Sequence, residues 1–291
     1  MNKPFQKSKI PDHMAFVVRD LIAPSFDSNW HFHPEYQLFL VLEGRGTRFV
    51  GDTMKPFREN DLVFTGPNLP HLWRNDQEYF HKSQKLKTHG IVVYFSADFI
   101  GEGLLEKEEF EGLKHLLQRS VRGLEVNGET NRVIRPMMKR LLTLKGLESI
   151  IHLLRILQLM VVSKDCHPIV QAGYTNMSKA SEEDRMSQVY DYVMDHFREG
   201  IRLEDVATLS NMTVSSFSRY FKSRMNKSFS DFLSDVRISH ACKLLHEERI
   251  NISEVCYESG FNTLSNFNRQ FKDRIGVTPM SYKKDFQQRF G

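Results

Sequence analysis

The stretch FSRYFKSR at residues 217–224 recurs as FNRQFKDR at residues 267–274, so the pattern F-x-R-x-F-K-x-R occurs twice. On a helix, residues four apart lie on the same face, so the two phenylalanines of each copy would pack inward together. Short polar side chains, an arginine and a lysine would share the opposite face. The repeat therefore predicts two amphipathic helices with matching buried and exposed faces.

A longer unit surrounds each copy of this pattern. LEDVATLSNMT precedes the first copy at 203–213, and ISEVCYESGFNT precedes the second at 252–263. In each stretch we expect a short helix, a left-handed residue that ends it and a threonine that caps the next helix. These residues are Asn211, Gly260, Thr213 and Thr263, and Asn226 and Gly276 would end the second helices. The sequence thus predicts two helix-turn-helix units, at about 203–224 and 252–274.

One helical pattern, SFSDFLSDVRISHACKLLHEE at 228–248, joins the two units. A helix of about 20 residues is about 30 Å long. Two helices that enter successive major grooves on one face of B-DNA lie about 34 Å apart. A connecting helix of this length is therefore compatible with two units that read one DNA duplex together.

The exposed faces of the two repeats are basic. From Ser210 onward, 13 Lys and Arg stand against 8 Asp and Glu, and residues 213–227 hold four basic residues and no acid. Serine and asparagine can reach base edges or phosphates, arginine can contact guanine with two hydrogen bonds, and lysine neutralises phosphate charge. A basic face that is merely solvated is the alternative, and the repetition of the whole unit favours DNA.

Residues 185–286 resemble the twin helix-turn-helix domain of the AraC/XylS family of bacterial transcription regulators. The resemblance is carried by ISEVCYESGFNTLSNFNRQFKDRIGVTPMSYKK at 252–284, although Cys256 and Tyr257 replace small residues of the family. It implies an all-helical domain over 185–291 that binds double-stranded DNA, with RNA polymerase as a further partner. The expected DNA-binding residues are Ser215, Ser218, Arg219, Lys222, Ser265, Asn266, Asn268, Arg269 and Lys272.

Residues 14–100 show short strand patterns separated by turn residues, which is typical of an antiparallel sandwich or barrel. In NWHFHPEYQ at 29–37, two histidines, a glutamate and a glutamine alternate, so in a strand they would face one side. This H-x-H pattern and a later histidine resemble a cupin β-barrel, which we assign to 1–105. The resemblance implies a barrel that binds a small-molecule effector, such as a sugar. The candidate pocket residues are His31, His33, Gln37, His71 and Trp73.

Whether this pocket holds a metal ion is left open by the sequence. Gln37 occupies the position at which metal-binding cupins carry glutamate, and Gln is a weaker, neutral ligand. Glu35 could replace it if the strand is irregular after Pro34. A polar pocket without metal and histidines with a purely structural role are the alternatives, so we assign no metal ligand and no cofactor.

Residues 106–163 show a helical period, and 164–184 lose it, which predicts a helical extension followed by a linker. The pattern at 148–162 is apolar around most of the helix, with Glu148, His152, Arg155 and Gln158 as one narrow polar stripe. Such a helix needs cover on two sides. The β-domain is one cover, and either a second subunit or the other domain of the same chain is the second. We therefore expect the helices at 131–162 to form a homodimer.

The 291-residue chain is long enough for two domains, and its three cysteines show no C-x-x-C spacing. Its beginning has no apolar segment of the signal-peptide kind, and no stretch is suited to span a membrane. We expect a cytoplasmic protein with reduced cysteines. No catalytic motif is recognised.

These observations predict an α+β multidomain fold: an N-terminal antiparallel β-barrel with a helical extension and a C-terminal all-α domain. The predicted function is sequence-specific DNA binding under the control of a small-molecule effector. A metal-dependent cupin enzyme with an attached DNA-binding module is the alternative.

Overall fold

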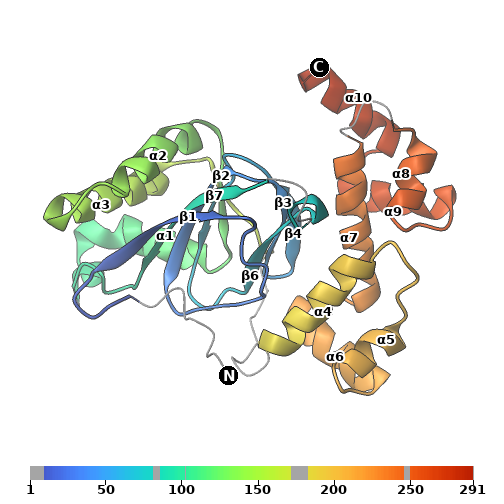
Figure 1. The fold of residues 1–291 in the computed structure, drawn as a ribbon. Coiled ribbons are helices and arrows are strands. Elements are labelled where there is room, and N and C mark those ends of the chain that lie inside the picture. The colour runs from blue at the N-terminus through green and yellow to red at the C-terminus, as the bar shows by residue number, and fades with distance from the viewer. Residues whose placement is uncertain (1–9, 81–85, 102, 172–182, 246–249, 291) are drawn as a thin grey trace. The chain divides into compact units, whose positions relative to one another are not determined.

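The structure is a computed structural model that describes residues 10–80, 86–101, 103–171 and 183–290, apart from 246–249 (Figure 1). Apart from Met54–Pro56, which are grouped with the second unit, the chain divides into one unit that ends at residue 176 and another that begins at residue 177. This boundary falls within the predicted linker, of which residues 172–182 lie outside the described part. The two units are described separately below.

The N-terminal unit contains two β-sheets. The larger has six strands in the order β1-β7-β2-β5-β8-β9, and the smaller has three in the order β4-β3-β6. The strands are β1 Phe16–Ala23, β2 Tyr36–Glu43, β3 Gly46–Val50, β4 Thr53–Phe57, β5 Leu62–Thr65, β6 His71–Asn75, β7 Thr88–Phe95, β8 Leu124–Val126 and β9 Cys166–Pro168. The pairing of β2 with both β5 and β7 is antiparallel. The predicted antiparallel β-domain is thus confirmed, as two sheets rather than one closed barrel.

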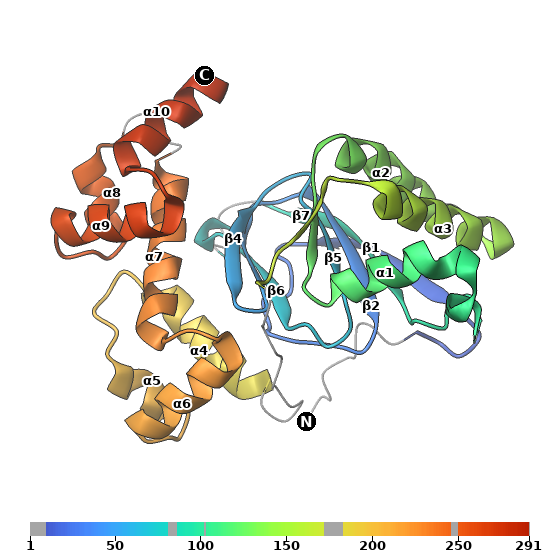
Figure 2. The same cartoon turned by 180° about the vertical axis from the view of Figure 1, so that it is seen from behind.

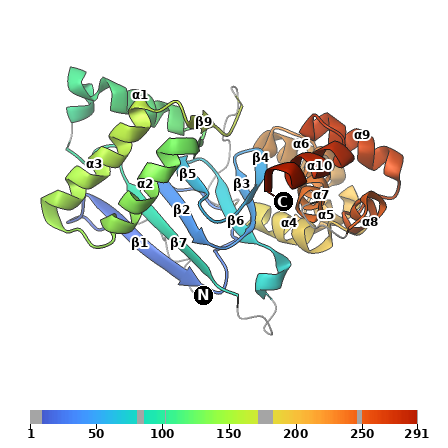
Figure 3. The ribbon, with the colours of Figure 1, turned by 90° about the horizontal axis from the view of Figure 1, so that it is seen from above.

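Alternation along β2 decides which side chains pack against which layer. Leu38 and Leu40 pack with residues of the helices, while Phe39 and Val41 pack with residues of the smaller sheet. Figures 2 and 3 show the helices α1 to α3 on one side of the larger sheet. The helices are α1 Glu111–Ser120, α2 Gly128–Leu141 and α3 Gly146–Val162, with 3-10 turns at Gln77–Phe80, Leu104–Glu106 and Glu108–Phe110. The larger sheet therefore has a core on both faces.

The start of the predicted linker is wrong. Residues Cys166–Pro168 form β9 and pair with β8, and the amide of Val170 donates to the carbonyl of Arg122. Cys166 is buried, and its carbonyl accepts a 2.6 Å hydrogen bond from Arg119 Nη2. This short segment adds an edge strand to the sheet although its sequence has no strand periodicity.

The predicted polar stripe of α3 is wrong at one residue. His152 is buried, and its Nε2 lies 3.1 Å from the carbonyl oxygen of Met137, to which it donates. The exposed stripe instead includes Leu147, Ile151 and Val162, which are 70%, 42% and 68% exposed. Glu148, Arg155 and Gln158 are exposed as expected, so the exposed face of the helix is wider than the polar stripe and presents more apolar surface than the polar pattern indicates.

The C-terminal unit is helical, as predicted. Its helices are α4 Glu183–His196, α5 Leu203–Leu209, α6 Val214–Met225, α7 Phe229–Leu244, α8 Ile252–Glu258, α9 Leu264–Ile275 and α10 Pro279–Phe290. The pairs α5–α6 and α8–α9 form the two predicted helix-turn-helix units. Asn211, Asn226, Gly260 and Gly276 all have positive φ, at 53°, 52°, 80° and 85°. The residues expected to end helices in the left-handed conformation therefore do so.

Helix α7 contributes to two separate cores. Phe229 and Phe232, in its first half, pack on Phe221 of α6 with ring centroids 5.4 Å apart in each case. Ile238 and Cys242, in its second half, belong to the core that contains the phenylalanines of α9. Figure 1 shows α7 running from the first helix-turn-helix unit to the second. It is the predicted connecting helix.

Among the helices that the structure describes, none has both the length and the apolar character needed to cross a bilayer. The cysteines Cys166, Cys242 and Cys256 are buried and unpaired, as expected from their spacing.

Candidate functional site

The repeated phenylalanines orient α6 and α9. Phe217 and Phe221 of α6 are 0% exposed, and so are Phe267 and Phe271 of α9. Both helices begin at the predicted threonines: the hydroxyls of Thr213 and Thr263 each accept a 3.3 Å hydrogen bond from the amide three residues later. The buried phenylalanines leave the opposite face of each helix in solvent. We call α6 and α9 the reading helices.

The residues expected to contact DNA lie on these outer faces. Those that are exposed are Ser215, Arg219, Lys222, Ser265, Asn268, Arg269 and Lys272. Ser218 and Asn266 are partly buried, and Ser218 donates to the carbonyl of Val214 at 2.9 Å. Asn266 Oδ1 accepts from Arg269 Nη2 at 3.1 Å, so Asn266 holds the guanidinium beside it. Each unit therefore presents an arginine and a lysine among small polar groups.

The last arginine of the repeated pattern differs between the copies. The guanidinium of Arg224 lies over the ring of Tyr220, 5.2 Å from its centroid. Arg274 instead forms an ion pair with Asp235 on α7, with Nε 2.6 Å from Oδ1. Arg224 and Arg274 are not among the residues expected to contact DNA, and no sequence signal indicates that α7 brings a carboxylate to Arg274.

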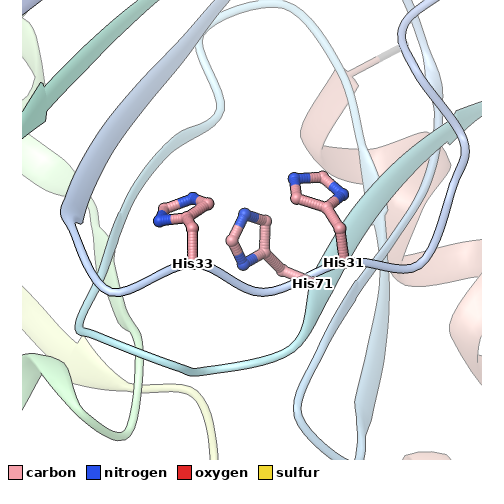
Figure 4. Close-up of side chains that lie close together, drawn as sticks. All are labelled: His31, His33 and His71. Carbon is pink, nitrogen blue, oxygen red and sulfur yellow. The ribbon is translucent and has the colours of Figure 1, made fainter. Parts of the chain in front are cut away.

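Three histidines converge in the N-terminal unit (Figure 4). His31 and His33 lie in the segment before β2, and His71 is the first residue of β6. One ring nitrogen from each lies within 4.8 Å of those of the other two. The sequence predicted that these residues meet, but it placed His31 and His33 in a strand. The strand begins only at Tyr36, and an isolated bridge between His31 and His71 brings the segments together, with the amide of His71 2.9 Å from the carbonyl of His31.

Backbone carbonyls define the tautomer of each ring. Nδ1 of His31, His33 and His71 lies 2.7, 3.0 and 2.7 Å from the carbonyl oxygens of Asn29, Glu35 and Leu69 respectively. A carbonyl only accepts, so each Nδ1 carries the proton and each neutral ring keeps a lone pair on Nε2. Burial lowers the pKa of His33 to about 4, with a smaller contribution from His31, and burial also lowers the pKa of His71 well below its usual value. Both rings are therefore neutral at neutral pH.

Gln37 lies between two of these lone pairs. Its Oε1 is 3.2 Å from His33 Nε2 and 3.3 Å from His71 Nε2. Unprotonated nitrogens cannot donate to this oxygen. Two arrangements resolve the conflict: the amide turns and its NH2 group donates to both rings, or a cation is shared by the rings and the oxygen. Neutral imidazoles with fixed Nδ1 protons fit a divalent transition metal.

Glu35 does not take the place of Gln37. Its Oε2 lies 3.5 Å from Nδ1 of His33, on the side of the ring that faces away from Gln37. The idea that an irregular strand after Pro34 lets Glu35 act as the fourth ligand is therefore not supported by the geometry. The group that faces the rings is the neutral amide.

Trp73 lies two residues after His71 on β6, and its ring centroid is 5.7 Å from that of His71. It is 4% exposed and packs edge-to-face on Phe39 at 4.8 Å. Its Nε1 is buried and has no hydrogen-bond partner among the described residues. A buried donor without a partner is uncommon in folded proteins, and a ligand with an acceptor would satisfy it. All five predicted pocket residues thus come together around one region.

Two family models match the chain. Residues 206–285 match a helix-turn-helix domain, and residues 19–79 match a cupin domain. Both matches agree with the placement of the helix-turn-helix units and of the two sheets. They also agree with the resemblance that the repeated pattern and the histidines indicate.

Named relatives of the chain include transcriptional regulators. The uncharacterized HTH-type transcriptional regulator YdeC of Bacillus subtilis is 26% identical over 267 residues, which cover 87% of this chain and 85% of YdeC. YfiF of the same organism, also named an uncharacterized HTH-type transcriptional regulator, is 22% identical over 86% of this chain and 76% of its own length. The similarity thus extends through both domains.

Solved structures were also compared. The DNA-binding domain of AdpA in complex with a target DNA is 23% identical over 36% of this chain and 96% of that chain, with a TM-score of 0.35. This likeness is too low to support an argument. The two domain matches and the full-length relatives carry the assignment: the chain combines an N-terminal cupin domain with an AraC-type DNA-binding helix-turn-helix domain, as in a transcription regulator.

Proposed function

We propose that the chain reads a specific DNA sequence with both reading helices and that a small molecule in the N-terminal unit controls this binding. The observation that carries the proposal is the pair of helix-turn-helix units with exposed basic faces on α6 and α9. Ligand control requires that the effector bind two arrangements of the protein with different affinity. The named relatives are regulators, so we propose no enzymatic role.

Substitution of Arg269 by alanine should relax the base preference at one position of the DNA site. We expect the binding free energy to fall by about 1–3 kcal/mol for DNA with the preferred base and by less for DNA with the other bases.

Substitution of Lys222 by alanine should weaken the binding of all DNA sequences alike and reduce the salt dependence of binding. Gel shifts measure both effects on a duplex that the full-length chain selects from a random-sequence pool.

The control for these variants is Arg132→Ala, which removes an exposed arginine of the N-terminal unit that pairs with Glu129. It should bind the selected duplex like the unmodified chain. If Arg269→Ala binds the duplex and its base variants like this control, Arg269 makes no base contact.

The effector site that we propose includes the three histidines, Gln37 and Trp73. The unpartnered Nε1 of Trp73 and the amide of Gln37 suit a ligand with hydroxyl or carbonyl oxygens, and a sugar is one such class. The ligand would be recognised by few polar groups within an apolar surround, because Trp73 belongs to the core between the two sheets.

The convergence of three imidazoles favours a second candidate, in which a divalent metal ion is the effector or helps to hold it. His31, His33 and His71 would bind the ion, with Gln37 Oε1 beside it. The ion would supply a positive charge that attracts oxygen atoms of a ligand. An enzyme would need, in addition, an open coordination position and a reactive substrate.

Addition of Zn²⁺ to metal-free protein should raise the melting temperature if this candidate is right. At a Zn²⁺ concentration 100 times the dissociation constant, the free energy of unfolding rises by about 2.7 kcal/mol. His31→Ala should remove this stabilisation, because it deletes one of the three ligands, and His31 is only half-buried. His167→Ala, which changes an exposed histidine on β9, is the matched control. Equal gains in both variants would place the metal outside the cluster.

We propose that a second copy of the chain docks on α1 and α3. A groove of about 450 Å³ lies between these helices, and its lining includes Phe110, Leu113, Leu154 and Val161 together with Glu109 and Arg155. Ile151 also lines the groove and is exposed, and the exposed Leu147 lies one turn before it on α3. When two copies pair, Glu109 of one copy can lie opposite Arg155 of the other.

RNA polymerase remains a predicted partner, and we assign no residues to its contact.

Substitution of Ile151 by glutamate should shift the protein from dimer to monomer, because a charge would be buried at the contact. Sedimentation velocity measures the change. Ile22→Glu alters an equally aliphatic residue that is 64% exposed on β1 and should leave the dimer intact. A monomeric unmodified chain, or a dimeric Ile151→Glu variant, contradicts the proposal.

A further inference from the structure

One carboxylate of α7 contacts the ends of both reading helices. Asp235 Oδ2 lies 2.9 Å from Nζ of Lys227, and Asp235 Oδ1 lies 2.6 Å from Nε of Arg274. Lys227 directly follows Asn226, which ends α6, and Arg274 lies in the last turn of α9. Each oxygen of the carboxylate thus holds one cation: Arg274 belongs to the last turn of α9, and Lys227 lies in the short connection between α6 and α7.

This bridge lies at the point where α7 passes from one core to the other. Phe232 of α7 packs in the first core and Ile238 in the second, and Asp235 lies between them in the sequence. The side chains of Asp235, Lys227 and Arg274 are 24%, 24% and 22% exposed, so they are partly shielded from solvent. Asp231, one turn earlier on α7, also reaches Arg274, at 3.6 Å from Nη2. The two cores are thus connected in two ways: by the backbone of α7, which contributes side chains to both, and by these ion pairs.

We propose that Asp235 is a positioning residue that fixes the spacing and rotation of α6 relative to α9, so that both helices meet one DNA duplex in register. The inference rests on the proposed function, because it assumes that both helices contact the same duplex. It also explains why the repeat is not used identically. Arg224 stacks on Tyr220 within its own helix, whereas Arg274 connects its helix to α7.

Asp235 should affect DNA binding through the geometry of the two reading helices rather than through folding stability. Ion pairs that solvent reaches contribute little to folding stability. Two linked binding elements, however, gain affinity from each other only if their separation matches the separation of their targets. Insertion of one base pair between the two targets shifts one of them by about 3.4 Å and rotates it by about 35°. A rigid pair of reading helices should distinguish these two spacings, and a loosened pair should not.

The test compares two duplexes. The first is one that the full-length chain selects from a random-sequence pool, and footprinting identifies the two segments of it that the bound protein protects from cleavage. The second is the same duplex with one base pair inserted between these two segments. The unmodified chain should prefer the selected spacing by a factor of about ten or more. Asp235→Asn should reduce this preference to about twofold, mainly by weaker binding to the selected spacing. Asp235→Glu, which keeps the charge, should restore most of the preference.

Asp273→Asn is the matched control, because it removes one negative charge from an exposed position next to Arg274 on α9. It corrects for the gain in DNA affinity that any lost carboxylate produces. Lys227→Gln is a second variant with an intact Asp235–Arg274 pair, and it should reduce the spacing preference as well. Thermal unfolding of every variant shows that each is folded at the assay temperature.

The inference is overturned if Asp235→Asn keeps the same spacing preference as Asp273→Asn. That result differs from failure of the proposed function itself. In that case the full-length chain selects no sequence, or the selected duplex shows only one protected segment.

Discussion

Substitution of Gly260 by alanine should unfold the second helix-turn-helix unit and abolish specific DNA binding. Gly260 has a φ of 80°, and a Cβ at this position would lie 2.6 Å from the carbonyl oxygen of Phe197 and 2.8 Å from Cα of Arg198. Both neighbours are backbone atoms, which a rotamer change cannot move away. Strain in the left-handed conformation and the forced displacement of the segment that follows α4 together should cost about 3 kcal/mol or more.

Gly276→Ala separates these two effects. Gly276 has a similar φ of 85°, but nothing lies within 4 Å of a Cβ built on it. Its substitution should therefore cost only the conformational strain, about 1 kcal/mol. Far-UV circular dichroism during urea denaturation follows the helices, most of which are in the C-terminal unit. Equal shifts for Gly260→Ala and Gly276→Ala would show that the close approach to Phe197 does not matter.

The same turn shows why the C-terminal unit could be predicted so fully from the sequence. Its features are local: phenylalanines four apart set the buried face, threonines cap the reading helices, and Asn or Gly ends them. Asn211 takes the left-handed conformation in the first unit and Gly260 in the second. Whether a Cβ fits at such a position depends on a distant segment, here Phe197, and only the structure supplies that information.

Features that depend on tertiary contacts were predicted poorly. The expected strand alternation identified the residues that meet, but His31 and His33 lie in a loop. An isolated bridge between His31 and His71, rather than a strand, brings them to His71. His152 is buried, and the carbonyl of Met137, on another helix, accepts a hydrogen bond from it. The ion pair of Asp235 with Arg274 joins residues 39 apart in the sequence. Polar residues in a periodic pattern do not reveal whether a partner from another element will bury them.

Substitution of Arg48 by alanine should destabilise the N-terminal unit by about 3–5 kcal/mol. Arg48 lies on β3 of the smaller sheet, and its side chain is 1% exposed. Its Nε lies 3.0 Å from Oδ2 of Asp61, beside β5, and its Nη2 pairs with Glu125 on β8. One guanidinium thus connects the smaller sheet to two strands of the larger one. Its removal would take a buried positive charge away from two carboxylates that are only 12% and 20% exposed.

Tryptophan fluorescence measures this effect, because the only two tryptophans of the chain, Trp30 and Trp73, are both buried in the N-terminal unit. Arg45→Ala is the matched control: Arg45 pairs with Glu78 at 2.6 Å but is 61% exposed, so its loss should cost no more than about 1 kcal/mol. Neutralising both carboxylates as well, with Asp61→Asn and Glu125→Gln, should recover part of the loss, because the charges that Arg48 attracts are then removed together with it. If Arg48→Ala shifts the fluorescence transition no further than Arg45→Ala, burial does not make this ion pair important. The connection between the two sheets would then rest on the apolar core alone.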